Sequence, residues 1–377
     1  MKWKELLEIR SGKNQKTVID PNGQYPIYGS GGIIGYATEY LCPPKTTIVG
    51  RKGTINSPIF VNESFWNVDT AFGLIPSSKL LPKYLYYFCC HFNFTALDKS
   101  TTIPSLAKRD LENIEMNVPP LGEQSRIVTR IDELFSELDK AVDTLKTTKE
   151  QLEVYRQAVL KDAFDNAQAM CERFTPIEEL LVTDRKGMST GPFGTMLKKH
   201  EHKTTGVPML GIENIDSGKF IDGNKIFVTP EKAAELKSFA LKSGDIIISR
   251  SGTVGELCVV PPRMEGALLS TNLMRVSLDC QKVLPEYFIY LFQSKGIVLD
   301  QVKELCKGST RIFLNQTILK QIQFPIPNVH EQLQIINTIE SRLTFCDNIE
   351  KTVDTALAQA DAMRQSILKQ AFEEGIV

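Results

Sequence analysis

The sequence PPLGEQSRIVTRIDELFSELDKAVDTLKTTKEQLEVYRQAVLKDAFD, residues 119–165, occurs a second time 208 residues further along the chain. The second copy, residues 327–373, reads PNVHEQLQIINTIESRLTFCDNIEKTVDTALAQADAMRQSILKQAFE and matches the first at 15 of 47 positions without a gap. A gapless match of this length is typical of a regular rod, because loops accumulate insertions.

Each copy is predicted to form one long helix. Proline is absent between Leu121 and Thr175 and after Pro327, and apolar residues recur at alternating steps of three and four. Asn328 and Glu331 have the spacing of a capping box, which would satisfy free backbone N–H groups at the start of the second helix. The apolar positions of the first copy are Ile127, Ile131, Leu134, Leu138, Val142, Leu145, Leu152 and Val159.

A helix of about 45 residues is roughly 65 Å long and is not stable alone in water. Since the other copy offers a similar apolar seam, the two helices are predicted to pair as an antiparallel coiled coil. This pairing would return the end of the chain to its beginning and give the molecule a pseudo-twofold axis.

The repeat extends more loosely into the rest of the chain. Residues 46–54 resemble residues 245–253, each a β-branched run that breaks into Arg-x-Gly-Thr, which predicts a buried strand ending in a tight turn. Leu81-Pro82 likewise matches Leu284-Pro285 ahead of an aromatic segment. The predicted fold is α+β, with two globular domains alternating with the helices. The predicted segments are a domain at 1–120, a helix at 121–168, a domain at 169–327 and a helix at 328–377.

The net charge of −1 over 377 residues conceals an uneven distribution. Residues 121–165 and 329–377 carry net charges of −3 and −4, whereas the two globular segments carry +3 each. This excess is compatible both with a nucleic-acid partner and with an ordinary mixed surface. The chain shows no export signal, no apolar stretch long enough for a membrane and no Cys-x-x-Cys, which predicts a cytoplasmic protein with reduced thiols.

Three motifs that could carry chemistry are interpreted as structural. The glycines of residues 29–35 lack the Lys-Ser/Thr of a phosphate-binding loop and open no helix, so a turn or loop is favoured. Residues 117–120, Asn-Val-Pro-Pro, depart from the Asn-Pro-Pro-aromatic motif of N-methyltransferases. His200 and His202 have no second cluster beside them, so no metal site is predicted. No catalytic residue is predicted either.

The candidate binding residues are cations next to small hydroxyls and a glycine turn, which can offer backbone N–H, hydroxyl and positive charge to a phosphate together. An ordinary surface turn is the alternative for each cluster, and recurrence at equivalent places in both copies favours binding. The candidates are Arg51, Lys52, Thr54, Lys99, Thr101 and Thr102 in the first copy, and Arg250, Ser251, Thr253, Lys307, Ser309, Thr310 and Arg311 in the second.

Two variable domains alternating with two repeated helices, each introduced by a proline-rich junction and Glu-Gln (Glu123-Gln124 and Glu331-Gln332), resemble the specificity subunit of type I restriction-modification enzymes. The resemblance implies that each domain is a target recognition domain for one half of a bipartite, asymmetric DNA sequence. It also implies that the helices are a spacer that docks two methyltransferase subunits. Those partners would bring S-adenosylmethionine, this chain would hold no cofactor, and endonuclease/translocase subunits could join.

Other functions are separable by experiment. The chain is also similar to the specificity chains of related enzymes that cut on both sides of their site. A coiled-coil scaffold whose globular domains bind proteins would select no DNA sequence. A self-sufficient methyltransferase would bind S-adenosylmethionine by itself, and the sequence lacks a cofactor loop for it.

Overall fold

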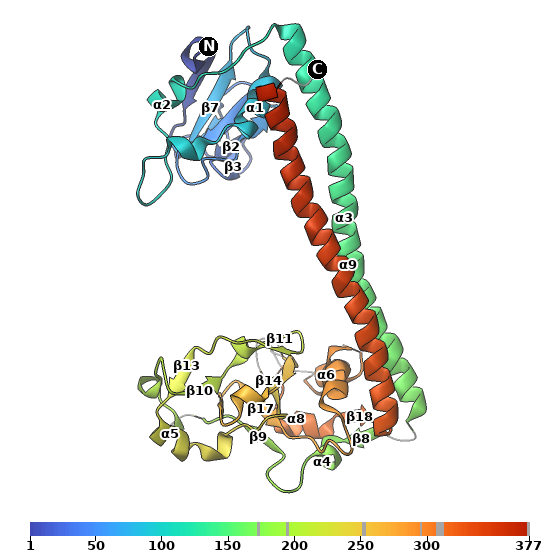
Figure 1. Ribbon diagram of the computed structural model, residues 1–377. Coiled ribbons are helices and arrows are strands. Elements are labelled where there is room, and N and C mark those ends of the chain that lie inside the picture. Colours follow the sequence, from blue (N-terminus) through green and yellow to red (C-terminus); the bar gives the residue numbers. More distant parts are fainter. Residues whose placement is uncertain (172–173, 194–195, 251–253, 295, 307–312, 375–377) are drawn as a thin grey trace. The chain divides into compact units, whose positions relative to one another are not determined.

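The chain divides into two compact units, one formed by Met1–Thr147 with Val353–Val377 and the other by Thr148–Thr352. Figure 1 shows the computed structural model, in which each unit holds one globular domain and part of both long helices, α3 (Leu121–Met170) and α9 (Val329–Lys369). These helices confirm the prediction from periodicity. The structure describes residues 1–171, 174–193, 196–250, 254–294, 296–306 and 313–374.

The helix α9 begins at the predicted capping box. The Asn328 N–H donates to the Glu331 carboxylate at 3.0 Å, and the Glu331 N–H donates to Asn328 Oδ1 at 3.0 Å. The chain leaves α9 through a π-helical turn, η8 (Gln370–Glu374). The helix α3 starts directly after Pro119 and Pro120, where proline's missing N–H costs nothing because the first turn has no acceptor for it.

Within the second unit the two helices run antiparallel. Arg156 of α3 pairs with Asp347 of α9 at 2.6 Å, and Asp162, further along α3, pairs with Arg342, earlier in α9, at 3.2 Å. Leu160 and Ile339 lie in one apolar cluster. The helix pairing predicted from the repeat is confirmed here.

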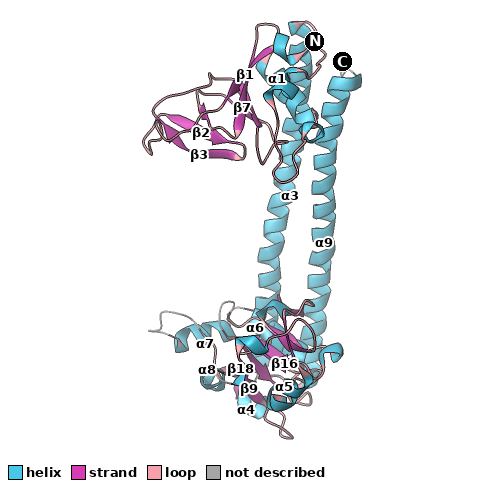
Figure 2. Ribbon diagram, turned by 90° about the vertical axis from the view of Figure 1, so that its left-hand side faces the viewer, coloured by secondary structure: helices cyan, strands magenta, loops and turns pink. Residues whose placement is uncertain are grey.

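The first unit repeats this pairing with the other ends of the helices, as both views show (Figures 1 and 2). Arg364 of α9 pairs with Asp139 of α3, and its guanidinium lies 5.2 Å from the Phe135 ring centre. Asp139 and Asp347 are 208 residues apart, as are Arg156 and Arg364. The same ion pair is therefore made once in each unit with the roles of the helices exchanged.

The first globular domain contains a four-stranded antiparallel sheet and a three-stranded sheet. The strand orders are β1-β7-β4-β5 and β3-β2-β6, the latter with a parallel β2/β6 pair. The helix α1 packs on the larger sheet against β4 and β7. The elements are β1 (Leu7–Ser11), β2 (Tyr25–Gly29), β3 (Gly32–Ala37), β4 (Thr46–Gly50), β5 (Ile59–Val61), β6 (Trp66–Asn67), β7 (Ala71–Pro76), α1 (Pro82–His91) and α2 (Lys108–Glu112).

The second globular domain has the same two sheets. Their orders are β9-β17-β14-β15 and β13-β10-β16, again with one parallel pair, β10/β16. The strands are β8 (Phe174–Pro176), β9 (Met188–Thr190), β10 (Val207–Leu210), β11 (Ile215–Asp216), β12 (Lys219–Phe220), β13 (Ile226–Val228), β14 (Ile246–Ser249), β15 (Leu257–Val259), β16 (Leu268–Leu269), β17 (Leu273–Val276) and β18 (Gln323–Pro325). The helices are α4 (Ile177–Leu180), α5 (Pro230–Glu235), α6 (Pro285–Gln293), α7 (Val298–Leu305) and α8 (Gln316–Gln321).

The β-branched runs predicted as buried strands are β4 and β14, and every residue of both strands is buried. The Leu-Pro pairs open α1 and α6, with proline in the first turn of each helix. The equivalence of the domains therefore extends beyond the aligned sequence to the sheets themselves.

Candidate nucleic-acid interface and its attachment to the helices

The turn after β4 holds Arg51 by its backbone. The Arg51 N–H donates to the Thr70 carbonyl at 2.8 Å, and the Arg51 carbonyl accepts from the Leu106 N–H at 2.8 Å. The guanidinium Nη1 donates to the Asp69 carbonyl at 3.4 Å and lies 5.8 Å from the Phe72 ring centre. The side chain is thus directed by one carbonyl and one ring, and it remains partly exposed at the domain surface.

Arg250 occupies the same position after β14. Its N–H donates to the Asn272 carbonyl at 3.0 Å, and its carbonyl accepts from the Leu314 N–H at 3.1 Å. The guanidinium donates from Nη1 to the Thr271 carbonyl at 3.2 Å and lies 5.5 Å from the Phe193 ring centre. Burial lowers the pKa of the Arg250 guanidinium, which at neutral pH is still charged.

Lys52 and Thr54 are exposed beside Arg51, on a turn that needs glycine at its centre. Gly53 has φ +79°, a left-handed conformation that other residues rarely adopt. Its N–H donates to the Pro104 carbonyl at 2.9 Å, and Lys52 forms a β-bridge with Ser105. The turn is therefore stapled to the loop that follows Asp98.

That loop carries the second candidate cluster of the first domain, Lys99, Thr101 and Thr102, all exposed. The Asp98 carboxylate holds it in shape by accepting from the Ser100 hydroxyl at 2.7 Å and from two backbone N–H groups, and these hydrogen bonds lower the pKa of Asp98. Lys99 Nζ lies 3.0 Å from the Asp110 carboxylate, an exposed pair of little energetic consequence. The structure thus brings the two predicted clusters of the first domain together.

The remaining candidates of the second domain lie outside the described residues. These are Ser251, Thr253, Lys307, Ser309, Thr310 and Arg311. The structure does describe the backbone next to these residues. The Leu314 N–H donates to the Arg250 carbonyl as the Leu106 N–H donates to the Arg51 carbonyl, and the two leucines are 208 residues apart.

The glycine stretch at residues 29–35 is the turn and second strand of the β2–β3 hairpin, which agrees with its interpretation as a turn. Its tip approaches the Arg51 turn, since a Cβ placed at Gly53 would lie 3.7 Å from Ser30 Oγ. Ile33 and Ile34 are 53% and 56% exposed on this hairpin. These two isoleucines are not among the binding residues predicted from sequence, although two β-branched residues flanked by glycines could have indicated an exposed hairpin.

The histidine motif is a polar surface segment. Glu201, between His200 and His202, pairs with Lys232 at 2.9 Å, and this hydrogen bond lowers the pKa of the Glu201 carboxyl. Among the described residues no group of three or more His, Cys, Asp or Glu is placed to hold a metal. The same residues include no helix long and apolar enough to cross a membrane.

A buried glutamine hydrogen-bonds each globular domain to the start of its own long helix. Gln124 is fully buried in the first turn of α3: its Oε1 accepts from the Leu81 N–H at 2.8 Å, and its Nε2 donates to the carbonyls of Lys79 and Pro119 at 2.9 and 2.8 Å.

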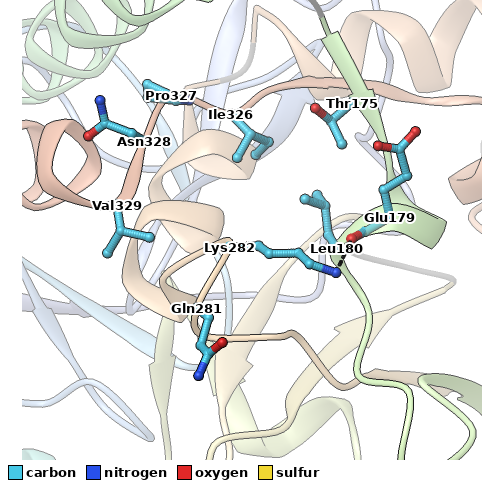
Figure 3. A pocket seen from close by; sticks show the side chains of 9 residues that line it. All are labelled: Thr175, Glu179, Leu180, Gln281, Lys282, Ile326, Pro327, Asn328 and Val329. Atoms are coloured by element: carbon cyan, nitrogen blue, oxygen red, sulfur yellow. Dashed lines mark hydrogen bonds between the residues drawn. The ribbon is translucent and has the colours of Figure 1, made fainter.

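Gln332 in α9 does the same, and it is also fully buried. It accepts from the Leu284 N–H and donates to the Lys282 and Pro327 carbonyls, with all three distances 2.8 Å. Beside this junction lies a pocket of about 520 Å³ in which Lys282 Nζ donates to the Glu179 carbonyl at 3.0 Å (Figure 3). The pocket is lined by Thr175, Glu179, Leu180, Gln281, Lys282, Ile326, Pro327, Asn328 and Val329.

The opposite helix contacts each domain through a phenylalanine. In the first unit Phe372, at the end of the chain's second helix, lies 5.1 Å from the Tyr84 ring centre. In the second unit Phe164, near the end of α3, lies 5.3 Å from Tyr287. Each domain is thus held by the beginning of one helix and by the end of the other, and the predicted return of the chain to its first domain is confirmed.

Two sheets per domain, equivalent arginine turns and two long helices that pair in both units define a chain with two related globular domains. The chain matches the model of the type I restriction modification DNA specificity domain over residues 1–154 and 193–359. It belongs to this family of specificity subunits, which recognise DNA for type I restriction-modification systems.

Individual relatives have low sequence identity to this chain but match most of its length. The chain is 23% identical to the type I restriction enzyme EcoBI specificity subunit of Escherichia coli, across 97% of this chain and 79% of that one. It is 26% identical to the EcoKI specificity subunit of E. coli strain K12, across 74% and 61%.

Solved structures share the fold. A chain from work described as the structural basis of complex assembly and conformational transition of the type I R-M system superposes with a TM-score of 0.74 at 14% identity, across 100% of this chain and 97% of that one. The HsdS subunit from Thermoanaerobacter tengcongensis gives 0.55 at 14% identity, across 100% and 96%.

Proposed function

We propose that the two globular domains read the two halves of a bipartite, asymmetric DNA target separated by a gap of fixed length. The observation that carries this proposal is the pair of equivalent turns at Arg51 and Arg250, set on the same sheets but surrounded by different connections. Two different readers on one scaffold require dissimilar half-sites, whereas identical readers related by a twofold axis would require a palindrome.

In this proposal the arginine turns contact the DNA backbone. Arg51 and Arg250 supply charge, while the hydroxyls and exposed backbone beside them supply hydrogen bonds, a combination that suits phosphate oxygens. The candidate residues of the 99–102 loop extend the same surface in the first domain. Negatively charged helices would lie away from the phosphates.

The helices would dock two methyltransferase subunits, one for each half of the repeat. Those partners would bind S-adenosylmethionine and methylate adenine, and this chain would supply neither cofactor nor catalytic residue. Endonuclease/translocase subunits would join the same assembly in a restriction complex, and a partner that both methylates and cuts would instead indicate an enzyme cleaving on both sides of its site.

The direct test is methylation of a random DNA pool by the chain assembled with its methyltransferase subunits and S-adenosylmethionine. Methylated adenines should map to two dissimilar short half-sites with one gap length. A pool without any enriched sequence would favour the protein-binding scaffold. Binding of S-adenosylmethionine by the isolated chain would favour the self-sufficient methyltransferase.

A second test asks whether the length of the helices sets the length of the gap between the half-sites. Four residues inserted in both helices, after Lys146 and after Asp354, lengthen each by about 6 Å. Since a base pair spans about 3.4 Å, the preferred gap should grow by about one or two base pairs while both half-sites stay the same. An unchanged gap would contradict this role of the helices.

A further inference from the structure

The buried glutamines at the two domain–helix junctions use their hydrogen-bonding capacity in an unusual way. Each amide joins two pieces of chain through three hydrogen bonds: two go to the loop before α1 or α6, including the N–H of the residue that caps that helix, and one goes to the proline junction before the long helix. Both N–H donors of each amide are used, and the oxygen accepts one bond. A planar group bonded in three directions fixes an angle, which apolar contacts alone do not.

The position of each glutamine links the long helix to the candidate DNA surface. Gln124 bonds to Leu81, the cap of α1; α1 packs on β4; and Arg51 follows β4 directly. In the second unit Gln332 bonds to Leu284, the cap of α6, and α6 shares an apolar cluster with β14, which Arg250 follows. One hydrogen-bonded path from each long helix to its arginine turn therefore runs through this amide.

We propose that Gln124 and Gln332 are positioning residues that orient the two recognition domains on their helices and thereby fix the gap between the half-sites. This inference rests on the proposed function, because it assumes two half-sites read by one chain. A glutamine that only stabilised the fold would, when replaced, weaken binding at every gap length alike. A glutamine that sets direction would, when replaced, change which gaps are accepted.

The test uses the full chain assembled with its methyltransferase subunits. Gln124→Met keeps the length of the side chain and removes all three hydrogen bonds, whereas Gln124→Glu keeps an acceptor for the Leu81 N–H and loses both donors. DNA carrying the two mapped half-sites is offered with gaps varied in single base-pair steps, and methylation is measured at each gap. Gln332→Met and Gln332→Glu repeat the test in the second unit.

We expect the methionine variants to accept neighbouring gaps, with discrimination between the preferred gap and its neighbours falling about tenfold, while both half-site sequences are kept. The glutamate variants should show a smaller fall. Gln151→Met and Gln359→Met are matched controls: these exposed glutamines are also 208 residues apart in the same helices, and their replacement should leave the gap profile unchanged.

An unchanged single gap in both methionine variants, with activity lowered uniformly, would overturn the proposal. Where a methionine variant loses the half-site of the altered domain and thermal unfolding shows that the domain has lost its fold, the glutamate variant of the same residue decides. An unchanged gap profile in that glutamate variant would then overturn the proposal. A wild-type chain that selects no pair of half-sites would instead refute the proposed function.

Discussion

The two globular domains share their sheets and differ in the chain that connects the strands. The first domain joins β2 to β3 through Ser30 and Gly31, whereas the second joins the matching strands β10 and β13 through residues 211–225, which contain the β11–β12 hairpin. The next connection also differs: residues 38–45 are irregular, and residues 229–245 include α5. Sheet order is fixed by the buried core, while surface connections are free to change, so we expect the differing connections to carry the sequence specificity.

The attachment of the domains shows the opposite behaviour. The glutamine bonds, the tyrosine–phenylalanine contact and the arginine–aspartate pair recur in both units at a spacing near 208 residues. Under the proposed function, two different sequences are read at a fixed distance, which requires domains that differ from each other and attachments to the helices that are the same in both units. The comparison predicts which changes affect one domain and which affect both.

The largest effect is expected from deleting residues 328–377. Ile367, Leu368 and Ala371 lie in the core of the first unit and Ile339 in that of the second, so both units lose buried apolar surface and both helix pairs are broken. We expect assembly with methyltransferase subunits to fall from two per chain to none, measured by co-purification and mass. A truncated chain that still binds both partners would show that the second helix is not needed for docking and would contradict this prediction.

A graft of the first domain's connection into the second should affect only one half-site. Replacing residues 211–225 by Ser-Gly removes the β11–β12 hairpin, which buried Asn214 holds by donating to the Ile221 carbonyl at 2.9 Å. Because each base pair that is no longer read costs about 1–3 kcal/mol, recognition of the second half-site should weaken roughly 5- to 150-fold for each base pair lost. Selection from a random pool measures both half-sites at once, so the first half-site is the internal control. Equal weakening of both would contradict the assignment of specificity to the connections.

Replacing Arg51 or Arg250 by Ala asks whether the equivalent turns have the same role. If the arginine binds a phosphate, its removal should weaken binding across all sequences and reduce the salt dependence by roughly one unit of slope. If it binds a base, its removal should cost about 1–3 kcal/mol and relax the sequence preference at one position. Binding is measured over a series of salt concentrations. Unchanged affinity in both variants would leave the arginines with their carbonyl and ring contacts as purely structural residues.

The long helices and the points where they begin could largely be predicted from sequence, because the signals for them are local. The apolar period of three and four, the Pro119-Pro120 stop and the Asn328–Glu331 spacing each lie within a few residues of the structure they specify. The identity of Gln124 and Gln332 was visible in the repeat, but their partners were not. Leu81 and Leu284 lie 43 and 48 residues away in sequence, and a tertiary hydrogen bond leaves no periodic trace.

The domains themselves were harder to predict for the same reason. The parallel pairs of Ile27 with Trp66 and of Met209 with Leu268 join distant strands of only a few residues, too short for a clear alternation of apolar and polar positions. The DNA-binding residues remain a prediction from chemistry, since cation, hydroxyl and glycine turns are common on surfaces. The structure adds that Arg51 and Arg250 follow equivalent strands and make equivalent backbone hydrogen bonds.

The smallest expected effect distinguishes the two copies of the arginine–aspartate pair. The Arg156 side chain is 19% exposed and reaches both Asp347 and Glu350, at 2.6 and 2.9 Å, whereas the Arg364 side chain is 31% exposed and has Asp139 and the Phe135 ring. The Arg156 pair should be the stronger one, because Arg156 is less exposed to solvent and binds a second carboxylate. Solvent-exposed ion pairs contribute only about 0–1 kcal/mol. We expect Arg156→Gln to lower the free energy of unfolding by about 1–2 kcal/mol and Arg364→Gln by less than about 1 kcal/mol. Denaturant unfolding at low and high salt measures both, and the Arg364 variant should lose more of its difference from wild type in high salt, since exposed charges are screened more. A larger cost at Arg364 would mean that its contact with the Phe135 ring outweighs the second carboxylate of Arg156.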